Sequence, residues 1–305
     1  MATTVTERWA GLETGAGPYG ICAGPDGALW CTLVHAGAVA RLDIGGGATA
    51  EVFPVGPALE GPSTITAGPD GALWFSAVTG HAIGRIAVDG AVTAFPLPSG
   101  GGGPFGLATG PDGALWFTES QGDRLGRLTP DGRFDAVPLP VAGAFPAGIT
   151  AGTGSGSDGA LWFTMNQANA IGRVAVDGSV TTYPLPTPAA APVGICTGPD
   201  GARWFVEIGA GQVGRITSDG EIDELPLPDR SARPHAICAG PDGRCWFTEW
   251  AANRIGAVDP ATGRFEHVDL PTPSAEPHGI CVGPDGALWA ALEVGALARI
   301  APLPT

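Results

Sequence analysis

Seven tryptophans recur along this chain at nearly constant intervals. They are Trp30, Trp74, Trp116, Trp162, Trp204, Trp246 and Trp289. The intervals between them are 44, 42, 46, 42, 42 and 43 residues, which lies in the range of the repeats that build β-propellers. The period therefore predicts an all-β, seven-bladed propeller with one tryptophan in each blade.

Each repeat contains the signals for four short strands. Residues 69–75 read PDGALWF, in which an Asp-Gly turn leads into an apolar strand. A second strand follows at 83–86, and the repeat ends at 95–98 with FPLP. Proline lacks the N–H that a central strand needs, so this last segment is predicted to be the outer edge strand of a four-stranded blade.

The first and last repeats are each incomplete. The seventh repeat stops shortly after residues 298–300, whereas residues 4–9 (TVTERW) form a spare strand of the outer-edge type. We therefore predict that the N-terminal strand completes the last blade and closes the ring, so that residues 1–305 form a single propeller domain.

Charge and hydropathy exclude several classes of partner. The formal net charge is −15, so no basic face is expected for nucleic acid or anionic lipid. No run reaches the roughly 18 apolar residues of a membrane span, and the N-terminus lacks a secretion signal pattern. The six cysteines occupy apolar repeat positions and are expected to be reduced. We expect a soluble, cytoplasmic monomer.

The repeats differ most at the residue that follows the proline at the start of each inner strand. In chain order these residues are Tyr19, Ser63, Phe105, Ala147, Val193, His235 and His278. Equivalent positions of a propeller converge on one mouth of its central channel. We therefore expect Tyr19, His235 and His278 to meet there, where crowded polar groups require a partner or a ligand. Hydrogen-bonded histidines without a catalytic role are the alternative.

Two glutamates of the seventh repeat suggest a metal site. Glu276 precedes the proline before His278, and Glu293 follows the adjoining strand. Two neighbouring carboxylates repel each other unless a proton or cation lies between them, and Mg²⁺ commonly takes one or two carboxylates with water. Glu293 stands four residues after Trp289, so strand alternation directs it to the opposite face unless a bulge intervenes.

Other acids and histidines are interpreted as having no role in a site. Glu119, Glu207 and Glu249 stand three residues after their tryptophans and are expected to be solvated or bonded to turns near the rim. The remaining histidines are predicted to be surface residues because they lie outside the start of the inner strands. They are His35, His81 and His267.

Four segments are more specific than the tryptophan repeat: residues 17–21 (GPYGI), 233–237 (RPHAI), 247–250 (FTEW) and 274–281 (SAEPHGIC). Through these segments the whole chain resembles the virginiamycin B lyase family, enzymes that open streptogramins. It implies an Mg²⁺-dependent lyase that linearises cyclic depsipeptides, the type B streptogramins, by elimination at the ester linkage.

The resemblance also implies roles for single residues. His278 would be the general base, Glu276 and Glu293 would hold Mg²⁺, and His235 and Tyr19 would contact the substrate. Two alternatives stay open on the sequence: a propeller hydrolase of the lactonase kind acting on another cyclic ester, and a binding propeller without catalysis.

Overall fold

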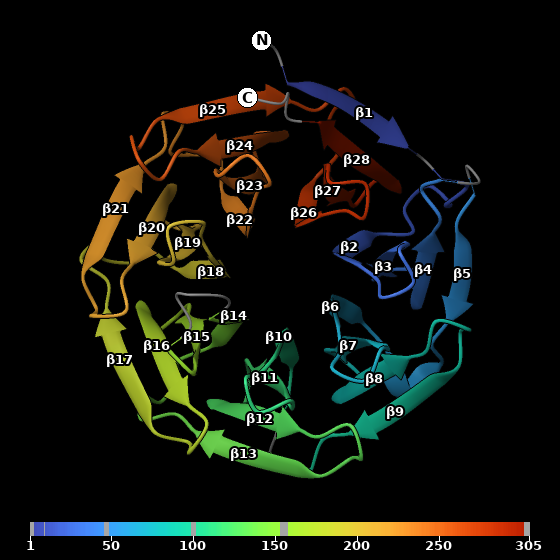
Figure 1. Ribbon diagram of the computed structural model, residues 1–305, viewed down its shortest axis with the longest axis horizontal. Coiled ribbons are helices and arrows are strands. Elements are labelled where there is room, and N and C mark those ends of the chain that lie inside the picture. Colours follow the sequence, from blue (N-terminus) through green and yellow to red (C-terminus); the bar gives the residue numbers. More distant parts are fainter. Residues whose placement is uncertain (1–2, 9, 46–48, 99–101, 153–157, 302–305) are drawn as a thin grey trace.

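The computed structural model describes residues 3–8, 10–45, 49–98, 102–152 and 158–301. Seven four-stranded antiparallel sheets are arranged as a ring around a central axis (Figure 1). A 3₁₀ turn, η1 (Pro57–Leu59), is described between two blades. The predicted seven-bladed β-propeller is confirmed.

In blades 1 to 6 the four strands run from the axis outward in chain order, and blade 7 has β26, β27 and β28 in that order with β1 outermost. The inner strands are β2 (Pro18–Ala23), β6 (Pro62–Ala67), β10 (Pro104–Thr109), β14 (Pro146–Ala151), β18 (Pro192–Thr197), β22 (Pro234–Ala239) and β26 (Pro277–Val282). The second strands are β3 (Leu29–Leu33), β7 (Leu73–Ala77), β11 (Leu115–Glu119), β15 (Ala160–Met165), β19 (Arg203–Glu207), β23 (Cys245–Glu249) and β27 (Leu288–Leu292).

The outer two strands complete each blade. The third strands are β4 (Ala38–Leu42), β8 (Ala82–Ile86), β12 (Arg124–Leu128), β16 (Ala170–Ala175), β20 (Gln212–Ile216), β24 (Arg254–Val258) and β28 (Ala296–Ala301). The outer strands are β5 (Glu51–Pro54), β9 (Val92–Pro96), β13 (Phe134–Pro138), β17 (Val180–Pro184), β21 (Ile222–Pro226), β25 (Phe265–Asp269) and, in blade 7, β1 (Thr4–Arg8).

The Asp-Gly turn of each repeat is tied to the strands that follow it. In blade 2, Trp74 Nε1 donates to Asp70 Oδ1 at 2.9 Å, and Arg85 Nε donates to Asp70 Oδ2 at 2.6 Å. The tryptophan indole N–H is thus satisfied although its side chain is fully buried. The repeated tryptophan therefore packs the core and also fixes the hairpin turn.

The core lies between adjacent blades. Trp74 and Ile83 of blade 2 pack with Leu107, Leu115 and Phe117 of blade 3. Each blade buries one apolar face against the next, so the ring must close for the last interface to form.

The N-terminal strand closes the ring, as predicted. β1 pairs antiparallel with β28, and the register places Val5 opposite Ile300. In Figure 1, β1 lies beside β28 at the outer edge of blade 7. Glu7 of β1 also connects to blade 6, because its Oε1 accepts a 3.0 Å hydrogen bond from the Thr272 N–H.

All six cysteines are free thiols. Among the described residues, no helix is long and apolar enough to cross a membrane.

Candidate functional site

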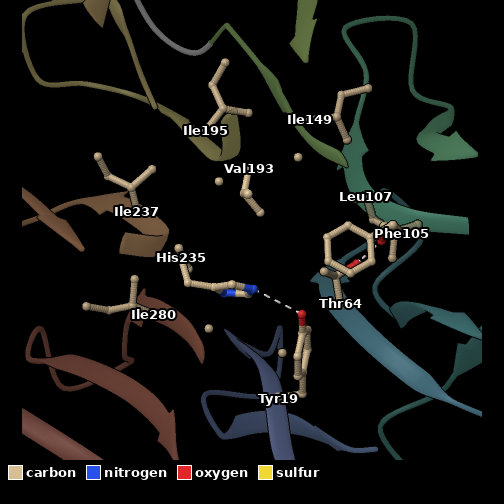
Figure 2. Close-up of a pocket in the computed structure, with 16 residues that line it drawn as sticks. Tyr19, Thr64, Phe105, Leu107, Ile149, Val193, Ile195, His235, Ile237 and Ile280 are labelled. Carbon is tan, nitrogen blue, oxygen red and sulfur yellow. Dashed lines mark hydrogen bonds between the residues drawn. The ribbon is translucent and has the colours of Figure 1, made fainter. Parts of the chain in front are cut away.

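Tyr19, His235 and His278 meet at the start of the inner strands, which confirms that part of the sequence prediction. The rings of Tyr19 and His278 stack with 4.4 Å between centroids and an interplanar angle of 29°. His235 packs edge-on against both rings, at 5.8 Å from Tyr19 and 4.9 Å from His278. Figure 2 shows the Tyr19 hydroxyl directed at His235, with 3.3 Å between Oη and Nε2.

The backbone around His278 is held from both neighbouring blades. Thr248 Oγ1 of blade 6 donates a 2.8 Å hydrogen bond to the His278 carbonyl oxygen. On the other side, a Cβ added at Gly279 would lie 2.6 Å from the Tyr19 carbonyl oxygen. The absence of a side chain at Gly279 therefore lets β26 and β2 approach closely enough for the Tyr19 and His278 rings to stack.

Glu293 contacts two histidines from different blades. Its Oε2 lies 2.5 Å from His278 Nε2, and its Oε1 lies 2.7 Å from His35 Nε2. His278 is 7% exposed, and the Glu293 side chain is 26% exposed. The carboxylate thus stands at the boundary between the buried rings and solvent.

Glu293 lies in the turn after β27, which is one residue shorter than the equivalent turn of blade 2. Trp289 pairs with Arg299, ten residues later, whereas Trp74 pairs with Arg85, eleven residues later. β27 ends at Leu292, so Glu293 is the first residue of the turn. The expectation that strand alternation would turn Glu293 away does not apply, because Glu293 lies outside the strand.

Glu276 lies opposite Glu293 at the end of the β26–β27 pair. The Glu293 N–H donates a 3.2 Å hydrogen bond to the Glu276 carbonyl oxygen, and Glu276 has a left-handed φ of 52°. At the same repeat position in blade 3, a Cβ added to Gly103 would contact Ser120 and Gln121 of the blade's own turn. The Glu276 side chain therefore starts toward the blade 7 turn, where Glu293 lies.

The two carboxylates are a suitable donor set for Mg²⁺. The Glu276 carboxylate makes no hydrogen bond or ion pair with the described residues, and each Glu293 oxygen keeps a second lone pair. The described residues contain no group of three or more His, Cys, Asp or Glu arranged to hold a metal. Mg²⁺ needs only one or two carboxylates when water and substrate oxygens complete its shell.

Burial controls the charge state of the three rings. It lowers the pKa of His235 to about 3 and, together with the Glu293 charge, raises the pKa of Tyr19 well above its usual range. Burial also lowers the pKa of His278, although the Glu293 carboxylate opposes that shift. For Glu293, burial raises the pKa, but hydrogen bonds from His278 and His35 outweigh it and the net shift is downward. All three rings are neutral at pH 7.

The opposite side of the channel mouth is apolar. A cavity of about 220 Å³ lies beside Tyr19 and His235, and its other walls include Phe105, Val193 and Ile195. Figure 2 shows these side chains around the same space. The cavity therefore offers an apolar surface to a ligand whose polar atoms face Tyr19 and His235.

The acids that follow the repeat tryptophans are not solvated, so one of the two predicted environments is wrong. Glu119, Glu207 and Glu249 are fully buried, because each is the last residue of its strand and pairs with the first proline of the inner strand. Glu119 accepts a 2.9 Å hydrogen bond from Arg124 Nε, and Glu249 is paired with Arg254. The side chains of these acids form internal ion pairs or hydrogen bonds with the neighbouring strand of the same blade.

Of the three histidines expected at the surface, His35 and His81 are exposed as predicted, whereas His267 is not. His267 is partly buried, with Nδ1 2.8 Å from Glu249 Oε1. His35 is exposed but contacts Glu293, so the sequence interpretation missed it as a site residue. The sequence did contain a signal for this contact, because the predicted ring closure places the turn after Trp30 next to blade 7.

Comparison with known protein families gives a match over nearly the whole chain. The family model of the virginiamycin B lyases matches residues 5–300, which covers all seven blades. The chain belongs to the virginiamycin B lyase family. Within this family it is 60% identical over 45 residues to the virginiamycin B lyase of Mycolicibacterium vanbaalenii, an alignment that spans 15% of each chain.

Solved structures of lyases match over the whole length. The selenomethionine-substituted virginiamycin B lyase from Staphylococcus aureus is 39% identical with a TM-score of 0.92, and the match covers 99% of this chain and all of the other. A catalytically inactive histidine-to-alanine variant of the S. aureus enzyme, solved with quinupristin, is 38% identical with a TM-score of 0.91 over 99% and 100% of the two chains.

Proposed function

We propose that this family member is a carbon–oxygen lyase that linearises type B streptogramins, cyclic depsipeptides, by elimination at their ester linkage. The observation that carries the proposal is His278, neutral and buried, stacked on Tyr19 and paired with the Glu293 carboxylate. The comparison with a lyase solved with quinupristin supports this substrate class.

His278 is the proposed general base. A neutral imidazole can accept a proton from the carbon next to a substrate carbonyl, and positioned bases contribute typically ~10² to 10⁴ in rate. The Glu293 carboxylate orients the ring and stabilises the positive charge that His278 gains. Glu293 lies at the edge of the buried rings, so the substrate can approach His278 from the open mouth of the central channel.

Tyr19 and His235 are the proposed substrate-contacting residues. Their neutral side chains donate and accept hydrogen bonds without adding a charge to the channel. The neighbouring apolar cavity would receive the hydrophobic side chains of the depsipeptide. Together these groups fix the ring of the substrate over His278.

Glu276 and Glu293 are the proposed residues that would hold Mg²⁺. When bound there, Mg²⁺ would draw electron density from a substrate carbonyl and make the adjacent C–H bond more acidic. His278 then takes that proton. The C–H electrons form a carbon–carbon double bond, and the ester oxygen leaves the next carbon as a carboxylate.

Product mass tests the reaction type directly. Incubation of the protein and Mg²⁺ with a type B streptogramin should yield a linear product of unchanged mass and altered retention in liquid chromatography–mass spectrometry. A product heavier by one water would show a hydrolase instead. Absence of conversion would contradict activity toward this substrate class.

A further inference from the structure

His35 shares the Glu293 carboxylate with His278 across the seam between blades 1 and 7. It lies in the turn between β3 and β4, and its side chain is 55% exposed. The two imidazole contacts use different carboxylate oxygens, Oε1 for His35 and Oε2 for His278. Both oxygens of Glu293 are therefore fixed, one from each side of the seam.

The local sequence of blade 1 makes room for this contact. A Cβ added at Gly17 would lie 2.5 Å from Cδ2 of the His35 ring. Blade 7 carries Glu276 at the repeat position that Gly17 occupies in blade 1. Because Gly17 has no side chain, this position does not block the His35 ring. In the next blades the counterparts of His35 are Thr79 and Gln121.

We propose that His35 is a positioning residue: its Nε2–H holds Oε1 of Glu293, so that Oε2 remains fixed against His278. This inference rests on the proposed function for its catalytic consequence. With one anchor removed, the half-exposed carboxylate can rotate about its terminal bond and lose alignment with the His278 ring. Both the neutral Nε2–H tautomer and the protonated ring of His35 can donate this bond.

Steady-state kinetics test the consequence for turnover. His35→Ala should lower kcat by about 10- to 100-fold with KM changed by less than about twofold, because alignment and not substrate contact is lost. His35→Gln retains an amide N–H near the former Nε2 and should recover most of kcat. Gln121→Ala, at the same repeat position in blade 3, is the matched control and should retain normal turnover.

A spectroscopic measurement tests the positioning without metal or substrate. In chelator-treated protein, the proton between His278 and Glu293 should give a far-downfield imidazole resonance in ¹H NMR, assigned by its loss in His278→Ala. The resonance should be present in the unmodified protein, in His35→Gln and in Gln121→Ala. It should be broadened or absent in His35→Ala.

The outcomes separate this inference from the proposed function. Failure of the unmodified protein to convert a streptogramin would overturn the lyase proposal, whereas the NMR result would still decide whether His35 holds Glu293. An unchanged resonance in His35→Ala, its absence from the unmodified protein, or unchanged kcat in an active enzyme would overturn the role of His35. If His35→Ala does not fold, His35→Leu keeps bulk beside Gly17 and replaces it in both measurements.

Discussion

The ring of Tyr19 in blade 1 stacks on the ring of His278 in blade 7, with 4.4 Å between their centroids. The two residues are the second residues of the inner strands β2 and β26, which become neighbours only when the ring closes. The candidate site therefore depends on closure, and so do the expectations for stability and turnover.

Removal of residues 1–12 should lower the melting temperature by about 10 °C or more. The deletion removes β1 and its pairing with β28, and it also removes Leu12 from the core beside Trp289. Differential scanning calorimetry provides the measurement. Deletion of residues 1–3, which leaves β1 intact, is the control, and an unchanged melt of the longer deletion would contradict closure by β1.

His278→Ala should reduce kcat by about 10² to 10⁴-fold while the protein remains folded. The side chain lies at the channel mouth, and the hydrogen bond from Thr248 to residue 278 uses the backbone carbonyl, which the variant retains. Turnover of a streptogramin and the far-ultraviolet circular dichroism spectrum are measured together. His81→Ala is the comparison histidine, since His81 is exposed and lies outside the site. Near-normal activity of His278→Ala would eliminate His278 as the base.

Mg²⁺ removal should abolish turnover, and added Mg²⁺ should restore it. Glu276→Gln should weaken Mg²⁺ binding by at least about tenfold, because one of two charged ligands becomes a neutral amide. Isothermal titration calorimetry of metal-free protein measures this affinity without substrate. Glu60→Gln, an exposed acid in blade 2, should bind Mg²⁺ normally. Full activity after exhaustive chelation would contradict a metal role for Glu276 and Glu293.

Glu207 should make the protein less stable as the pH rises from about 4.5 to 7. Burial raises the pKa of this carboxyl from 4.5 to about 7, although the Gln212 amide opposes the shift with a 2.7 Å hydrogen bond. Below pH 4.5 the folded and unfolded chains both hold the proton. Between the two pKa values only the unfolded chain ionises, so the cost grows to about 3 kcal/mol and is then constant above pH 7.

Glu207→Gln removes this pH-dependent cost. The melting temperature of the variant relative to the unmodified protein should therefore increase between about pH 5 and about pH 8. Glu221→Gln, an exposed acid in the same blade, should show no such change. If the melting temperatures of Glu207→Gln and the unmodified protein differ by the same amount at about pH 5 and about pH 8, the raised pKa of Glu207 is contradicted.

Sequence alone determined the number of blades, the closing strand and the meeting of Tyr19, His235 and His278. The physical reason is that a repeat imposes one backbone path on every blade. Equivalent positions then converge on the axis, however far apart they are along the chain.

Only the tertiary structure decided the positions of His35, Glu293 and Glu119. Glu293 lies in the turn after β27, and ring closure brings His35 of blade 1 to its second carboxylate oxygen. Glu119 is buried at the end of β11, where Arg124 of the paired strand β12 is its partner. Periodicity describes where the backbone goes, whereas side-chain direction at a turn and burial between sheets depend on neighbours that the repeat does not encode.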